Sequence, residues 1–252
     1  MKKITAFVIV ELKKLYRAPM NLAVMVIMPV ALALIFYFAL RNVYNDYYPI
    51  PGMNHFEFLL PGLMGYAVIY MGMMVALSLV EFRQSGVLDR IKVTPVSTAE
   101  FLISQIIANM IIAVIQALIV LFVAWVLGFR PLGGIAGLIL VVMFLALLAV
   151  TAVGLGLITA AVSKDTGVAG GLSVIFILPM MMFGALLAVF NDATLAIAKF
   201  TPNFYVSASL MTILFEGKVN DPSILKNFLI LSVIGVVIVM LGIQLFERVK
   251  TP

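Results

Sequence analysis

Long apolar segments alternate with short polar ones along most of this 252-residue chain. A helix needs about 20 apolar residues to cross a bilayer, because the hydrocarbon core is about 30 Å thick and each helical residue rises about 1.5 Å. Six segments of this kind contain no Asp, Glu, Lys or Arg: residues 22–40, 58–80, 102–127, 135–162, 168–190 and 228–246. The pattern predicts an all-α, polytopic membrane protein with six transmembrane helices, forming a single domain over residues 1–252.

A further apolar stretch, residues 193–215, is interrupted in its middle. Lys199 and the run Thr201-Pro202-Asn203 divide it into two halves. Each half has only about ten residues, which is too short to cross the hydrocarbon core. We expect two short re-entrant helices here, which dip into the membrane from one side or lie on it before the last span.

The first 18 residues have the pattern of an amphipathic helix. Apolar side chains recur at helical spacing and form one stripe: Ile4, Phe7, Val8, Leu12 and Leu15. Basic side chains occupy the rest of the circumference, so we expect an interfacial helix that lies along the membrane surface. Glu11 falls within the apolar stripe. It either forms a salt bridge to Lys14 or Lys3 or contacts a partner protein.

The basic residues indicate the orientation of the chain. Of the 16 Lys and Arg residues, eleven lie on the side of the membrane that holds both termini of a six-span chain. Loops rich in Lys and Arg stay in the cytoplasm. The distribution therefore predicts cytoplasmic termini and a multi-pass protein of the cell membrane. Because the basic residues follow the ends of apolar segments, the net charge of +5 does not indicate nucleic-acid binding.

The segment between the second and third spans predicts a short cytoplasmic helix. Val87, Leu88 and Ile91 can share one face of this helix, and charged residues occupy its other faces. Ser97 and Glu100 then form the pattern of a capping box directly before an apolar run. We therefore expect an amphipathic helix followed by a well-defined start of the third span.

The chemistry that the chain lacks narrows its function. It has no cysteine, one histidine (His55) and no G-x-x-x-x-G-K-[ST] phosphate-binding loop. The expected spans carry only amides and hydroxyls, such as Gln105, Asn109 and Gln116, which we interpret as hydrogen-bonding contacts between helices. Ion-coupled transporters usually carry ionisable groups in the bilayer. We expect a non-catalytic chain without metal or cofactor, whose energy comes from another polypeptide.

Several motifs resemble those of the type 2 ABC permeases, the membrane subunits of ATP-binding-cassette exporters. They are the run from Glu11 to Pro19, Leu60-Pro61-Gly62, Glu81-Phe-Arg83 through Gly86-Val-Leu-Asp-Arg90, Thr94-Pro95-Val-Ser97, and Phe200-Thr-Pro202. The third and fourth motifs are similar to the cytoplasmic signature of the drug-export, daunorubicin-resistance-like branch.

The resemblance implies a mechanism and partners. Two permeases would form a homodimer, and each would bind one ATPase subunit that holds ATP and Mg. Residues 86–92 would form the coupling helix, and residues 1–18 the connecting helix beside it. The residues that would couple the permease to the ATPase are Glu11, Arg83, Gly86, Leu88, Asp89, Arg90 and Lys92.

The resemblance also implies a substrate path between the two protomers, lined by the first, second and fifth spans. The candidates in this sequence are Tyr66, Tyr70, Met73, Met74, Met180, Met181 and Phe183. Methionine is flexible and polarisable and suits varied apolar ligands, so we expect export of a hydrophobic or amphiphilic drug, lipid or peptide. The same side chains could instead serve packing or lipid contact. The alternatives are export of a cell-envelope polysaccharide, an autonomous transporter or channel, and a membrane enzyme or scaffold.

Overall fold

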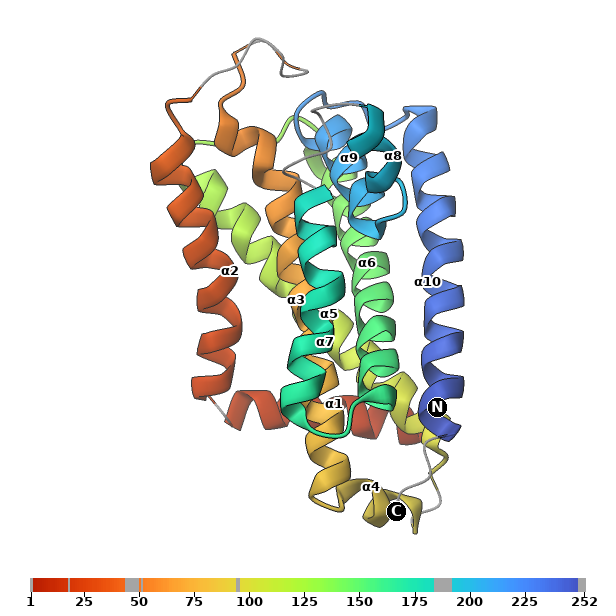
Figure 1. Ribbon diagram of the computed structural model, residues 1–252. Helices are drawn as coiled ribbons and strands as arrows, with labels where there is room; N and C mark the ends of the chain where they lie inside the picture. The colour runs from red at the N-terminus through yellow and green to blue at the C-terminus, as the bar shows by residue number, and fades with distance from the viewer. Residues whose placement is uncertain are drawn as a thin grey trace.

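The computed structural model describes residues 2–17, 19–43, 50, 52–93, 96–183 and 192–248. In this part of the chain every regular element is a helix, which confirms the all-α prediction (Figure 1). The helices are α1 (Lys2–Arg17), α2 (Pro19–Leu40), α3 (His55–Gln84), α4 (Val87–Lys92), α5 (Thr98–Val126), α6 (Gly134–Val162), α7 (Thr166–Met181), α8 (Asp192–Ala198), α9 (Pro202–Leu214) and α10 (Pro222–Arg248).

Four of the described helices, α3, α5, α6 and α10, are long and apolar enough to cross a membrane. The apolar helical stretches Val26–Leu40, within α2, and Thr166–Met181, which is α7, are shorter. The expected fifth span continues to residue 190, but its last seven residues lie outside the described part of the chain. The structure therefore shows a multi-pass helical bundle, and a count of six spans depends on α2 and α7.

The helix α3 extends beyond both ends of the predicted second span, 58–80. It begins at His55, where Asn54 and Glu57 form a capping box: the Glu57 amide donates to Asn54 Oδ1 at 2.9 Å, and the Asn54 amide donates to Glu57 Oε2 at 3.1 Å. It ends at Gln84 and has 30 residues. At 1.5 Å per residue it is about 45 Å long, which exceeds the thickness of the hydrocarbon core.

The centre of the bundle is the close packing of α3 on α6. A Cβ atom on Gly72 would lie 2.4 Å from the carbonyl oxygen of Ala152, and one on Gly156 would lie 2.4 Å from the carbonyl oxygen of Gly72. On another side of α6, Gly154 and Gly242 allow α10 to approach closely. Small residues at such contacts let helix backbones meet in membranes, where van der Waals packing drives association.

The remaining helices mark the two ends of the bundle (Figure 1). At one end, α1 lies across the long helices, packs against α5 and α2, and has α4 beyond it; we call this the α4 end. The helices α8 and α9 lie at the opposite end, the α9 end. They occupy the stretch in which we expected two short helices, and they are separated at Lys199–Thr201. Of the two, α9 packs on α3, α6 and α10.

Candidate functional site

The short helix α4 is held on the bundle by one side and is exposed on the other. Gly86, with φ of +70°, allows the chain to turn from α3 into α4, since a residue with a side chain rarely adopts this conformation. Leu88 is only 8% exposed and belongs to a buried cluster that includes Leu79 and Phe101. Arg90 is exposed. The helix therefore offers an anchored polar surface at the α4 end.

Two further residues on α4 are predicted to couple the permease to the ATPase, Asp89 and Lys92. Asp89 is exposed, and Val93, directly after the helix, is 86% exposed. Lys92 is the last residue of α4, and its side chain lies outside the described part of the structure. Thr94 and Pro95 of the sequence motif also lie outside it.

The side chain of Arg83 forms hydrogen bonds to the end of α6 in the same chain. Its guanidinium donates to the carbonyl oxygen of Ala160 at 3.3 Å and to that of Ser163. The last carbonyl groups of a helix have no partner within that helix, and a cation at this end also interacts favourably with the helix dipole. Arg83 therefore caps the C-terminal end of α6 and joins it to the end of α3. Gln84 extends this contact, since its side-chain amide donates to the carbonyl oxygen of Lys164 at 3.5 Å.

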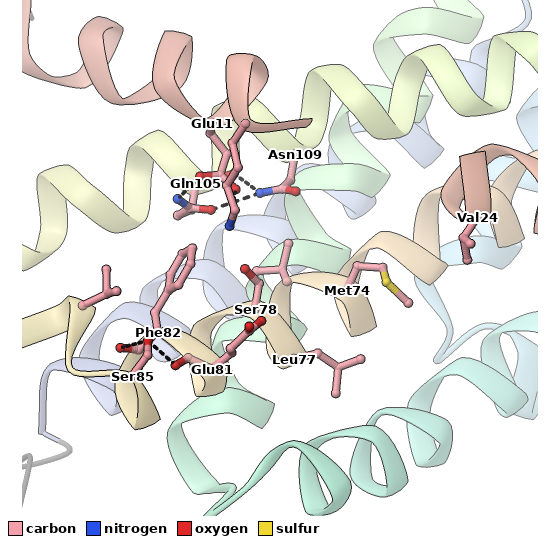
Figure 2. A pocket seen from close by; sticks show the side chains of 13 residues that line it. Glu11, Val24, Met74, Leu77, Ser78, Glu81, Phe82, Ser85, Gln105 and Asn109 are labelled. Carbon is pink, nitrogen blue, oxygen red and sulfur yellow. Dashed lines mark hydrogen bonds and ion pairs between the residues drawn. The ribbon is translucent and has the colours of Figure 1, made fainter. Parts of the chain in front are cut away.

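A polar network explains the position of Glu11 (Figure 2). Gln105 Nε2 of α5 donates to Glu11 Oε2 at 3.2 Å, and Asn109 Nδ2 donates to Gln105 Oε1 at 3.3 Å. Lys14 Nζ lies 3.9 Å from Glu11 Oε1 and 4.3 Å from the centroid of the Phe82 ring. The salt bridge to Lys14 is thus confirmed, and the interhelical role expected for the amide of Gln105 is confirmed as well. This network joins α1, α3 and α5.

The substrate-path candidates on α3 share one helix face. Tyr66, Tyr70, Met73 and Met74 are each partly exposed, whereas most of their neighbours on α3 are buried. Tyr70, Met73 and Met74 follow Tyr66 by four, seven and eight residues, which places all four along one side of the helix. The rings of Tyr66 and Tyr70 have centroids 6.3 Å apart. The structure brings these four residues together as a stripe, which we call the α3 stripe.

The candidates on the fifth predicted span differ from one another. Met180 is only 6% exposed and belongs to the main core, so its side chain packs inside the protomer. Met181 and Phe183 are partly exposed at the end of α7. Since α7 packs along α3, Met181 and the α3 stripe lie on adjacent helices, and Phe183 lies two residues beyond the end of α7.

Asn203, at the start of α9, is a buried contact that the sequence patterns did not reveal. Its side chain is fully buried, and its Nδ2 donates to the carbonyl oxygen of Met180 at 3.1 Å. A Cβ atom on Gly65 would collide with the same side chain. Asn203 therefore joins α9 to the end of α7 and to α3. Its position after Thr201-Pro202, a helix-start pattern, is the only sequence signal for it.

The described residues contain no candidate site for a metal ion. Among them, no three His, Asp or Glu side chains gather in a way that could hold a metal ion. The polar groups at the α4 end include those of α4, the network around Glu11, and the side chains of Arg83 and Gln84 that bind the end of α6. This arrangement is suited to binding and to mechanical contact.

Long apolar helices, packed through small residues, define the chain as a multi-pass membrane protein. It belongs to the ABC-2 type transporter family, whose family model matches residues 2–215. This assignment makes the chain a transporter permease, and it implies that the chain works with an ATP-binding-cassette ATPase in a membrane. A comparison with curated proteins found no match.

Proposed function

We propose that this chain is the membrane subunit of an ATP-binding-cassette exporter of the drug-export branch, and that it moves a hydrophobic or amphiphilic drug, lipid or peptide out of the cell. A separate ATPase subunit binds ATP and Mg and performs the hydrolysis. Family membership supports a transporter permease, and the sequence contains no phosphate-binding loop of its own.

The observation that carries the proposal is the construction of α4. Leu88 is buried in the bundle, whereas Asp89 and Arg90 on the same helix are exposed. Because α4 is anchored in this way, a movement of the bound partner is transmitted through α4 to α3, and α3 runs through the bundle. ATP binding to the partner thereby biases the permease between two conformations. The helix α1, joined to α5 through Glu11 and Gln105, acts beside it as the connecting helix.

The topology in this proposal has six spans, which include α2 and α7, with both termini in the cytoplasm. The α4 end is then cytoplasmic, and α8 and α9 are re-entrant helices at the outer face. The excess of Lys and Arg on the side of the termini supports this orientation. The cell membrane is the location that follows from it.

The substrate path lies between two copies of the chain. The α3 stripe and the neighbouring residues Met181 and Phe183 are only partly covered within one protomer. A second copy would complete the walls around them. An uncharged lining of tyrosine and methionine suits a hydrophobic or amphiphilic substrate.

The test is a double substitution on α4, Asp89→Ala with Arg90→Ala, in the permease co-expressed with its ATPase. We expect normal membrane insertion, weaker co-purification of the ATPase, and loss of most substrate-stimulated ATP hydrolysis, because both charges lie on the proposed contact surface. The pair Glu247→Ala with Arg248→Ala is the matched control. It removes the same two charge types from an exposed site at the end of α10. Unchanged ATPase binding and stimulation in the α4 variant would refute the coupling role.

A further inference from the structure

A cavity of about 530 Å³ opens at the α4 end, between α1, α2, α3, α5 and Val87 at the start of α4. This volume lies within the range of sites that hold drug-sized ligands. Its walls include two amide side chains that are largely buried, Gln105 at 3% and Asn109 at 7% exposure. The cavity lies inside one protomer. It shares only Met74 with the α3 stripe, which faces the proposed path between protomers.

The lining of the cavity combines apolar and polar side chains (Figure 2). Val24 and Met74 lie at one end of the view, and Glu81 and Ser85 lie toward the other. Ser78 lies between these groups on α3. A ligand that matches this lining has an apolar body and a polar or charged head, as amphiphiles do.

The charges of the cavity favour a positive head group. Its ionised side chains are Glu11, Glu81 and Lys14, which leaves an excess of one negative charge. Glu11 is already bound by Lys14 and Gln105. Among the described residues, no ion pair engages the carboxylate of Glu81. Glu81 is therefore the group that can bind a cation from outside the chain.

The chain itself shows that this wall accepts a cation. The ammonium group of Lys14 lies between the carboxylate of Glu11, at 3.9 Å, and the face of Phe82, at 4.3 Å from the ring centroid. A cation is attracted to the face of an aromatic ring, and a nearby carboxylate adds a favourable charge interaction. Phe82 directly follows Glu81 on α3, so the free carboxylate and this ring border the same cavity.

We propose that this cavity is a binding site for amphiphilic organic cations, in which Glu81 binds the cationic head and Val24 and Met74 contact the apolar body. The proposal deepens the proposed export function and rests on it for the role of the site in transport. In that role the cavity receives the cation at the cytoplasmic side, before it reaches the α3 stripe through Met74.

The binding test uses the full-length permease purified in a nonionic maltoside detergent, without the ATPase. The probe is radiolabelled tetraphenylphosphonium, and binding is measured by equilibrium dialysis against protein-free micelles. We expect saturable binding that weakens about tenfold in Glu81→Gln, which corresponds to the loss of one moderate charge interaction. Tetraphenylborate, an anion of closely similar size and shape, should neither bind saturably nor compete.

Two further variants distinguish binding in the cavity from nonspecific binding of the probe to the protein or detergent. Glu247→Gln removes an exposed carboxylate at the end of α10 and should bind the probe like the wild type. Met74→Trp fills the apolar part of the cavity and should weaken binding even though every charge remains. Equal binding by the wild type and Glu81→Gln, equal competition by tetraphenylborate, or unchanged binding by Met74→Trp would overturn the proposal.

The binding and coupling tests can fail separately. The Asp89→Ala, Arg90→Ala permease should bind tetraphenylphosphonium normally, because neither Asp89 nor Arg90 lines the cavity and Val87, the residue of α4 that does, is unchanged. Failure of the coupling test therefore leaves the binding result intact. If tetraphenylphosphonium does not bind as expected, the proposed coupling of α4 to the ATPase is unaffected.

Discussion

Arg83 shows how a single residue can match a functional pattern while serving the fold. The resemblance of Glu81-Phe-Arg83 to the ABC permease signature implies a role for Arg83 in ATPase coupling, which no observation tests. The structure continues α3 through this position and directs the guanidinium to the carbonyl groups of Ala160 and Ser163. The sequence could not reveal this contact, because it joins positions about 80 residues apart.

Replacing Arg83 should destabilise the isolated permease. Loss of the hydrogen bonds from a charged donor to the end of α6 is expected to lower the free energy of unfolding of Arg83→Ala by about 1.5–3 kcal/mol. Arg83→Lys should recover only part of this, because an ammonium group does not present the two-pronged geometry of a guanidinium. Thermal unfolding in detergent measures the effect. Unchanged stability in Arg83→Ala, together with loss of ATPase binding, would favour a coupling role instead.

Glu11 could be predicted in part. Its spacing of three residues from Lys14 suggested the salt bridge that the structure contains. The hydrogen bond from Gln105 is a contact between α1 and α5, and periodicity within one helix carries no information about its neighbours. For the same reason, Glu81 did not stand out as a cavity residue.

At the scale of helices, apolar length and capping patterns predicted much of the fold. The capping box of Ser97 and Glu100 is confirmed, with the Glu100 amide donating to Ser97 Oγ at 3.1 Å and the Ser97 amide donating to Glu100 Oε2 at 2.9 Å. The equivalent box of Asn54 and Glu57 is not predicted by the apolar pattern, because the predicted second span begins only after the charged residue Glu57. A carboxylate at a helix start is stabilising when it caps free amides, so α3 extends past it.

The contact between α3 and α6 should depend on Gly72. A methyl group there would lie 2.4 Å from the carbonyl oxygen of Ala152, so the two helices would have to separate. We expect Gly72→Ala to lower the free energy of unfolding by about 1–3 kcal/mol, the usual cost of overpacking a core. The measurement is again thermal unfolding of the purified permease.

Gly171→Ala is the control for this substitution. Gly171 also lies within a membrane helix, α7, but a methyl group added there would have nothing within 4 Å apart from its own helix. This variant should be as stable as the wild type or slightly more stable, because alanine favours a helix over glycine. Equal effects of the two substitutions would contradict a special role of Gly72.

At the scale of the whole molecule, family membership and the α4 end together support an ATPase-driven permease. Composition was sufficient to predict a membrane protein, since 64% of the residues are hydrophobic and 11% are charged. The pairing of helices was not predictable in this way, because apolar residues that face lipid and those that face another helix look alike in a bilayer. The cavity between α1, α2, α3 and α5 results from that pairing.

The proposed mechanism requires that the α4 end faces the cytoplasm, where an ATPase can bind it. The chain has no cysteine, so single thiols can be introduced at two highly exposed positions, Val93 beside α4 and Phe200 between α8 and α9, which are 86% and 87% exposed. The measurement is labelling by a membrane-impermeant maleimide in intact cells. We expect Phe200→Cys to be labelled, whereas Val93→Cys should react only after the membrane is permeabilised. Labelling of Val93→Cys in intact cells, with Phe200→Cys protected, would contradict this orientation and the mechanism with it.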